Sequence, residues 1–173
     1  MSIHTKLAGL LLAASVFTPF APAIGAEGRA APDFAGVTQW LNSAPLSMAG
    51  LRGKVVLVNF WTYGCSNCVA TMPHVNRLYD AYSGKGLVIV GVHTPEFPFE
   101  KSTGNVRAAI GRFGIRYPVA QDNSFATWNA YRNQYWPAQY IVDRGGEIVF
   151  SHSGEGAYDT IDRTIRNLLE AGR

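Results

Sequence analysis

The sequence has 173 residues, of which 47% are hydrophobic and 16% charged, and its formal net charge is +3 at pH 7. This apolar content supports one well-packed core and excludes an intrinsically disordered chain, while the length leaves little room for a second ordinary domain. Charges of one sign form no long run, so nucleic acid is not expected as a partner.

The first residues have the order of a secretory signal. A short polar start containing Lys6 precedes the apolar stretch Leu7 to Phe17, and small residues follow through Ala26. This order predicts a signal peptide over residues 1–26 and a periplasmic or otherwise extracytoplasmic protein after its cleavage. The alternative is an uncleaved segment that anchors the chain, although the apolar stretch is shorter than the roughly 20 residues of a membrane-spanning helix.

Residues 27–36 lack periodicity and are rich in Ala, Gly and Pro, which predicts a flexible N-terminal arm. One folded domain is expected over residues 37–173, beginning with short edge strands between Gln39 and Met48. Val55 to Phe60 is then a run of β-branched and aromatic residues, as expected of a buried central strand.

The segment from Cys65 to Tyr82 changes to helical periodicity. Its apolar residues recur at spacings of three and four, which indicates one buried face and places His74 on the exposed side. Leu87 to Val92 is a second buried strand. The strand, helix and strand therefore predict a right-handed βαβ unit with parallel strands.

The second half of the chain predicts further helices and a hairpin. Helices are expected over Asn105 to Phe113, Ser124 to Asn129 and Tyr158 to Leu169, with a short extended segment over Tyr117 to Ala120. Two strands, Ala138 to Val142 and Glu147 to Ser151, flank turn residues that give a strong hairpin signal. Together these elements predict an α/β fold with a mixed central β-sheet flanked by helices on both faces.

The two cysteines of the chain, Cys65 and Cys68, stand where the first buried strand passes into the following helix. A thiolate at Cys65 gains from the free N–H groups and the positive dipole end of that helix. Cys68 lies one turn further in, where it is shielded yet able to attack a mixed disulfide on Cys65. Cys65 is therefore expected to be the entering nucleophile, and Cys68 the resolving thiol of a redox-active disulfide.

Three stretches, NFWTYGCSNCVATMPHVNRLY, GLVIVGVHTPEFPFEK and NAYRNQYWPAQYIVD, resemble the thioredoxin superfamily, and within it the exported TlpA/ResA-like thiol–disulfide oxidoreductases. They look most similar to the thioredoxin-like domain of DipZ proteins. The resemblance implies a thioredoxin-like fold, exported cysteine-containing proteins as substrates and a membrane electron donor of the CcdA or DsbD type. The chain departs from many relatives at Gly64, where they carry Trp directly before the first cysteine.

The resemblance also assigns roles outside the cysteine motif. Trp136 and Pro137 match the cis-proline position beside the cysteines, where the backbone pairs with a substrate strand. Glu96 follows the second buried strand at the same sheet edge, and a partly buried carboxylate there could exchange a proton with Cys68. A solvated loop carboxylate is the alternative for Glu96, and His93 is expected to be a packed or surface histidine.

A cysteine pair can also serve functions other than disulfide reduction. A zinc site needs about four ligands, and no second ligand pair stands at a recognisable spacing. A peroxidase of the same fold carries its reactive cysteine in a PxxxTxxC context, which neither cysteine has. A non-catalytic binding module and a thiol oxidase or isomerase stay open. The dipeptide between the cysteines carries no positive charge, which favours a reductant over a strong oxidant. No cofactor and no metal is expected.

Overall fold

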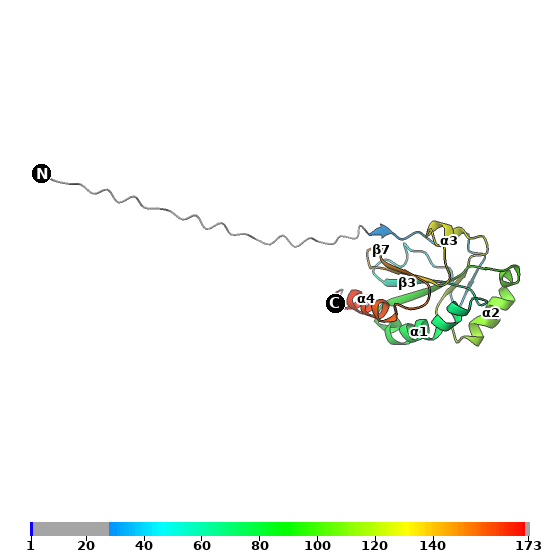
Figure 1. Ribbon diagram of the computed structural model, residues 1–173. Coiled ribbons are helices and arrows are strands. Elements are labelled where there is room, and N and C mark those ends of the chain that lie inside the picture. The colour runs from blue at the N-terminus through cyan, green and yellow to red at the C-terminus, as the bar shows by residue number, and fades with distance from the viewer. Residues whose placement is uncertain (2–27, 172–173) are drawn as a thin grey trace.

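A seven-stranded mixed sheet organises the part of the chain that the computed structural model describes, Met1 and residues 28–171 (Figure 1). The strands lie in the order β1-β7-β6-β3-β4-β5-β2. They are β1 Arg29–Ala30, β2 Gln39–Leu41, β3 Val55–Trp61, β4 Leu87–His93, β5 Val119–Gln121, β6 Ala138–Val142 and β7 Glu147–Ser153. The predicted signal peptide, residues 1–26, lies outside the described residues apart from Met1.

The centre of the sheet is formed by β3 and β4. All seven residues of β3 are buried, which explains its run of β-branched and aromatic side chains. It pairs in parallel with β4 along its whole length, from Val55 beside Leu87 to Trp61 beside His93. The carboxyl ends of both strands therefore meet at one edge of the sheet, and the loops that leave them lie side by side.

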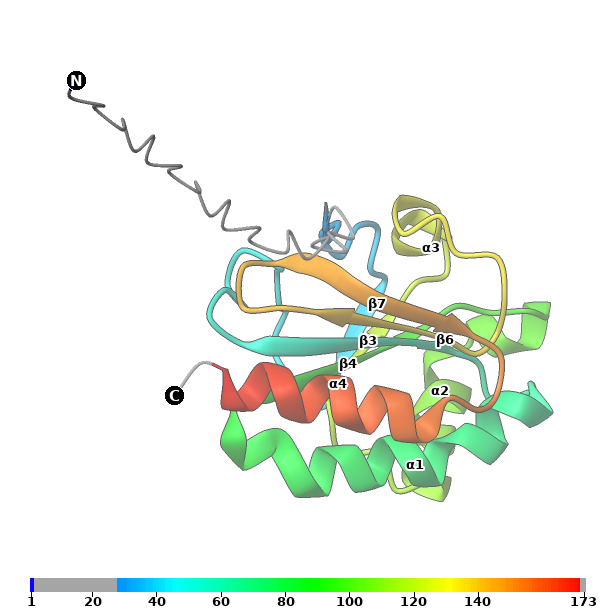
Figure 2. The same cartoon turned by 60° about the vertical axis from the view of Figure 1, so that its left-hand side comes forward.

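Helices cover both faces of the sheet (Figure 2). The helices are α1 Ser66–Tyr82, α2 Thr103–Arg112, α3 Ala126–Ala130 and α4 Tyr158–Glu170, with short 3-10 turns at Ser83–Lys85 and Pro98–Lys101. Apolar residues of α1, α2 and α4 pack on one face together with Leu41, and α3 packs on the other with Phe34, Met48 and Leu51. The predicted α/β class with a mixed, two-sided sheet is confirmed. Among the described residues, no helix has the length and apolar character needed to cross a membrane.

The described part of the predicted N-terminal arm is ordered by contacts with the domain. Arg29 and Ala30 pair antiparallel with β7, and the Phe34 ring meets Trp40 edge to face at 5.5 Å. The carboxylate of Asp33 accepts the N–H of Met48 at 2.8 Å. β7 offers an outer edge whose backbone groups β1 can pair, so this part of the predicted flexible arm has a partner in the domain.

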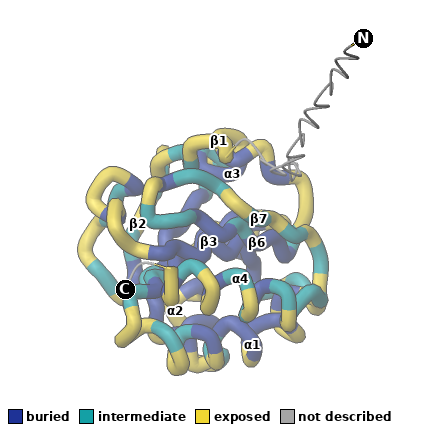
Figure 3. Tube along the Cα trace, turned by 90° about the vertical axis from the view of Figure 1, so that its left-hand side faces the viewer, coloured by how far each residue is buried: buried dark blue, intermediate teal, exposed yellow. Residues whose placement is uncertain are grey.

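The buried face of α1 follows the predicted spacing, with Cys68, Met72, Val75 and Leu78 packed on the sheet. Figure 3 colours the trace of α1 partly as buried and partly as exposed. His74 is also buried, which contradicts its expected exposure. The ring of Tyr158 at the start of α4 lies 4.4 Å from the His74 ring and covers it. A neighbouring helix, rather than the sheet, buries this side of α1.

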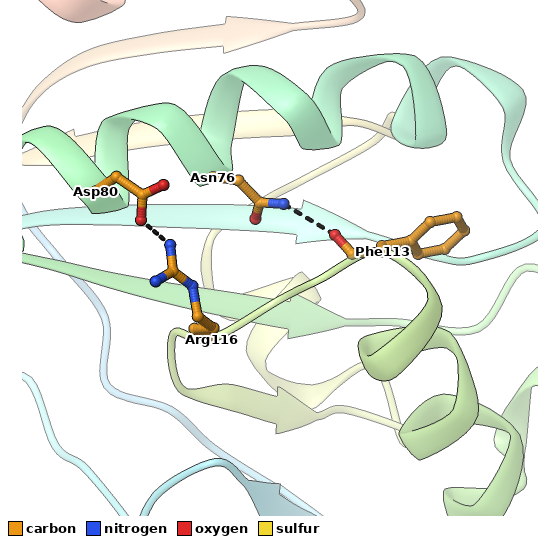
Figure 4. A network of polar contacts seen from close by, with 4 residues as sticks. All are labelled: Asn76, Asp80, Phe113 and Arg116. Atoms are coloured by element: carbon orange, nitrogen blue, oxygen red, sulfur yellow. Dashed lines mark hydrogen bonds and ion pairs between the residues drawn. The ribbon is translucent and has the colours of Figure 1, made fainter.

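Polar contacts attach α1 to the segment that follows α2 (Figure 4). The Asn76 amide donates to the carbonyl of Phe113 at 2.9 Å, and Arg116 forms an ion pair with Asp80. The ion pair is exposed, and such pairs contribute only about 0–1 kcal/mol. The hydrogen bond from the Asn76 side chain and the apolar core beneath it therefore hold α1 against the segment that follows α2.

Candidate active site

Cys65 caps the N-terminus of α1 immediately after the turn that leaves β3. Its backbone is extended, with φ −83° and ψ 117°, and its Sγ accepts the N–H of Cys68 at 3.4 Å. This is the position of an N-cap side chain, which satisfies a helix N–H that has no partner within the helix. The predicted strand-to-helix junction is confirmed, and it directs the first sulfur to the end of the helix dipole.

The two cysteines differ in exposure. Both are free thiols, Cys65 half-buried and Cys68 fully buried. Burial raises the pKa of the Cys68 thiol far above its usual range, and the nearby Cys65 and Glu96 act in the same direction. A backbone hydrogen bond from Thr62 opposes this rise without cancelling it. Cys68 is therefore held as a neutral thiol behind the accessible Cys65.

The segment before β6 brings Trp136 and Pro137 to the cysteines. The peptide bond between them is cis, as predicted. The Cys65 thiol donates to the carbonyl of Trp136 at 3.8 Å, and the Trp136 indole donates to the carbonyl of Thr94 at 3.0 Å. Four of the five sequence-predicted site residues are thus assembled around one sulfur atom.

Glu96 is placed differently from the expectation. Its side chain is exposed, so the prediction of a partly buried carboxylate is wrong. The loop after β4 turns its next acidic residue inward instead, and Glu96 contributes its backbone N–H to that buried group. The charge of Glu96 still raises the pKa of Cys68 from outside the core.

The buried group is Glu100, which the sequence analysis did not select. Its Oε1 accepts the N–H of Gly64 at 2.8 Å, and its Oε2 accepts the N–H groups of Glu96 and Phe97 at 2.6 and 2.9 Å. Burial alone would raise the pKa of this carboxyl, but hydrogen bonds from the Thr62 side chain and these backbone groups hold it below its usual range. A fully buried anion therefore lies under the loop that carries Cys65.

His93 fills the space between this loop and the sheet. Its ring stacks on Tyr63 at 5.6 Å and meets Trp61 edge to face at 5.0 Å. Burial lowers the pKa of His93 to about 4, so the ring is neutral at pH 7. His93 is thus a packed histidine, the first of its two expected placements. Within the described residues, His, Cys, Asp and Glu side chains nowhere gather in the groups of three or more that hold a metal ion.

A cysteine pair at the N-terminus of a helix, beside a cis-proline and on a mixed sheet, defines a thiol–disulfide oxidoreductase of thioredoxin-like fold. The family model described as Redoxin matches residues 26–167, and the chain belongs to this family. Within the thioredoxin superfamily it is a TlpA/ResA-like member.

Individual relatives agree with this assignment. The chain is 49% identical to protein DipZ of Mycobacterium tuberculosis over 142 residues, which are 80% of this chain but only 20% of DipZ. It is 30% identical to the thiol-disulfide oxidoreductase ResA of Geobacillus kaustophilus, with 83% of this chain and 78% of ResA covered. A solution structure of a thioredoxin-like protein in the oxidised form superposes with a TM-score of 0.75 at 27% identity, covering 83% of this chain and 97% of that one.

Proposed function

We propose that this protein is an exported reductant of disulfide bonds in extracytoplasmic proteins, with Cys65 as the nucleophile and Cys68 as the resolving thiol. The observation that carries the proposal is the unequal exposure of the two sulfurs. Cys65 is accessible at the helix terminus, whereas Cys68 is fully buried one turn behind it. A substrate disulfide can therefore reach the first sulfur while the second is kept for the following step.

The reduction of a substrate disulfide takes place in two exchange steps, one on each cysteine. The Cys65 thiolate attacks one sulfur of a substrate disulfide, forming a mixed disulfide and releasing the other substrate sulfur as a thiolate that takes up a proton. Cys68 then loses its proton and attacks the Sγ of Cys65, which releases the reduced substrate. The protein is left with a Cys65–Cys68 disulfide. A dithiol donor must restore it, and we propose a membrane protein of the CcdA or DsbD type.

Exposed aromatic residues around Cys65 support a polypeptide substrate. Phe97 and Phe99 stack on each other at 5.6 Å and are 46% and 58% exposed, and Tyr135 is 60% exposed. Phe97 adjoins Gly64, and Tyr135 directly precedes Trp136. Apolar side chains flanking a substrate cysteine would find contacts on both sides of the nucleophile, while the backbone at Trp136 and Pro137 would pair with the substrate strand.

Export is proposed on the order of residues 1–26, which follows that of a secretory signal. Expression of the full chain in a bacterial host with a periplasm, followed by N-terminal sequencing, tests it. We expect a periplasmic product that begins after cleavage between Ala23 and Ala26. An unprocessed chain in the membrane fraction would favour the anchor, and an unprocessed chain in the cytoplasm would contradict export.

The exchange reaction is tested by reduction of insulin with dithiothreitol as the electron source. Wild type should accelerate precipitation of the reduced insulin chains, and Cys65→Ser should reduce the rate to that of dithiothreitol alone. Equal rates for the two proteins would overturn the proposal. Serine differs from cysteine by one atom and keeps the N-cap acceptor, so the comparison isolates the sulfur.

A further inference from the structure

The hydrogen bonds of Glu100 join two loops that the chain separates. Gly64 belongs to the turn before Cys65, and Glu96 and Phe97 belong to the loop after β4. One carboxylate accepts the N–H groups of all three residues, at 2.8 Å from Gly64 and at 2.6 and 2.9 Å from Glu96 and Phe97. Hydrogen bonds to an ionised, buried acceptor are the strong class, so the two loops are held at a fixed separation.

The carboxylate reaches the cysteine pair through the residue next to Cys65. Gly64, whose N–H it accepts, precedes Cys65 in the chain, and the Cys65 Sγ in turn accepts the N–H of Cys68. Moving Glu100 would therefore shift the peptide that carries Cys65 and the sulfur that caps the helix at Cys68. The influence of Glu100 on the cysteine pair passes through the backbone of Gly64.

The missing side chain at Gly64 leaves room for this carboxylate. A Cβ built on Gly64 would lie 2.6 Å from Glu100 Oε1, closer than real Cβ atoms approach other heavy atoms. The φ of Gly64 lies outside the left-handed region, so its backbone conformation does not itself demand glycine. A side chain at position 64 would therefore meet the buried carboxylate, and the glycine leaves the space that Oε1 occupies.

We propose that Glu100 is a positioning residue of the Cys65–Cys68 couple and that Gly64 is the residue that admits it. The inference rests on the proposed function, since it concerns how readily the dithiol closes. Closing the pair converts two thiols into one disulfide and releases two electrons and two protons to the substrate disulfide. A fixed loop raises the effective concentration of one sulfur at the other, which favours closure and thus a reducing couple.

The test compares the equilibrium constant for closing the Cys65–Cys68 disulfide, measured against a glutathione buffer, in wild type and two variants. Glu100→Gln keeps the size of the side chain but has a single acceptor oxygen, so its NH₂ group faces either the N–H of Gly64 or those of Glu96 and Phe97. Gly64→Ala keeps the charge but displaces Oε1. We expect each variant to lower the constant about tenfold, which is about 30 mV for this two-electron couple. Glu155→Gln, an exposed carboxylate on the loop before α4, serves as the control and should match wild type.

The double variant gives a second criterion. If Gly64 acts through Glu100, the Gly64→Ala change should have little further effect in the Glu100→Gln background, and the two effects should not add. If Glu100→Gln does not fold, the equilibrium constant of Gly64→Ala alone tests the inference. A wild-type constant in folded Gly64→Ala or folded Glu100→Gln would overturn the inference. Failure of the proposed function would look different. It would change the value expected for the wild-type equilibrium constant, whereas failure of this inference would leave wild type and the variants with the same constant.

Discussion

The N–H of Gly64 donates to the Glu100 carboxylate at 2.8 Å, across 36 positions of the chain and one residue before Cys65. The contact exists because β3 and β4 are parallel and end at the same edge of the sheet. Loops that leave two such strands meet there, and one of them carries the cysteines while the other carries the buried acid. This pairing gives the active site a polar support beneath the half-buried Cys65.

The two cysteines should react unequally with a thiol reagent. In the reduced, folded protein we expect iodoacetamide to label Cys65 at neutral pH, with Cys68 at least about a hundredfold slower, because each unit of raised pKa lowers the thiolate fraction about tenfold. Burial both raises the pKa of Cys68 and blocks access to it. Fragment mass spectra locate the label. Equal labelling before unfolding would contradict the assignment, and urea should make both residues reactive.

Serine variants should separate the two steps of the exchange. Cys68→Ser should accumulate a mixed disulfide between Cys65 and a substrate peptide, because no second thiol is present to resolve it. Cys65→Ser should form no such adduct under the same conditions, since Cys68 is buried. Non-reducing electrophoresis with a disulfide-bonded peptide measures both. A stable adduct on Cys65→Ser alone would reverse the assigned roles.

The stability of the protein should fall as the pH drops below neutral. The buried His93 ring stays neutral down to a pKa of about 4, whereas the unfolded chain binds this proton below its usual value of 6.5. Between these values the unfolded state holds more protons, so about 3 kcal/mol of stability is lost on acidification. Urea unfolding at about pH 7.5 and about pH 4.5 measures this loss.

His93→Phe provides the comparison, since it keeps an aromatic ring against Tyr63 and Trp61. The variant should lose less stability than wild type over the same interval. A smaller slope should remain, because burial also lowers the pKa of His74. An unchanged slope in His93→Phe would contradict the account of His93.

Glu100 should stabilise the fold in its ionised form. Its folded pKa lies below the ordinary value of 4.5, so its contribution is present above that value and is lost as the pH falls through the folded pKa. At pH 7, Glu100→Gln should cost about 2–3 kcal/mol, since buried N–H groups lose a charged acceptor. The difference from wild type should narrow in acid, as followed by urea unfolding. A constant difference across this range would show that charge is not the cause.

Apolar periodicity and turn residues predicted most of the helices and strands. The buried strands around Val55 and Leu87, the helix after Cys65 and the hairpin around Gly145 follow from local patterns of apolar and turn residues, and all are present. The neighbourhood of Cys65, Trp136 and Pro137 was expected from the family resemblance and is also found. The strand, helix and hairpin signals lie within short stretches of chain, whereas the contact between Cys65 and Trp136 spans 71 positions and was expected from the resemblance alone.

Other contacts between distant segments were not predicted. The loop after β4 contains two glutamates, and its pattern does not say that Glu96 faces solvent while Glu100 enters the core. The burial of His74 depends on Tyr158, and the order at Arg29 depends on the edge of β7. The glycine at position 64 was the available clue to Glu100, since a missing side chain beside a nucleophile indicates that another group occupies the space.

The equilibrium reduction potential of the Cys65–Cys68 pair, measured against glutathione and dithiothreitol buffers, tests the central claim most directly. A positioned pair without a positive charge between its cysteines should be reducing, with a potential near that of thioredoxin, about −270 mV. A potential near that of the strong oxidants, about −120 mV, would contradict the assignment of this protein as a reductant.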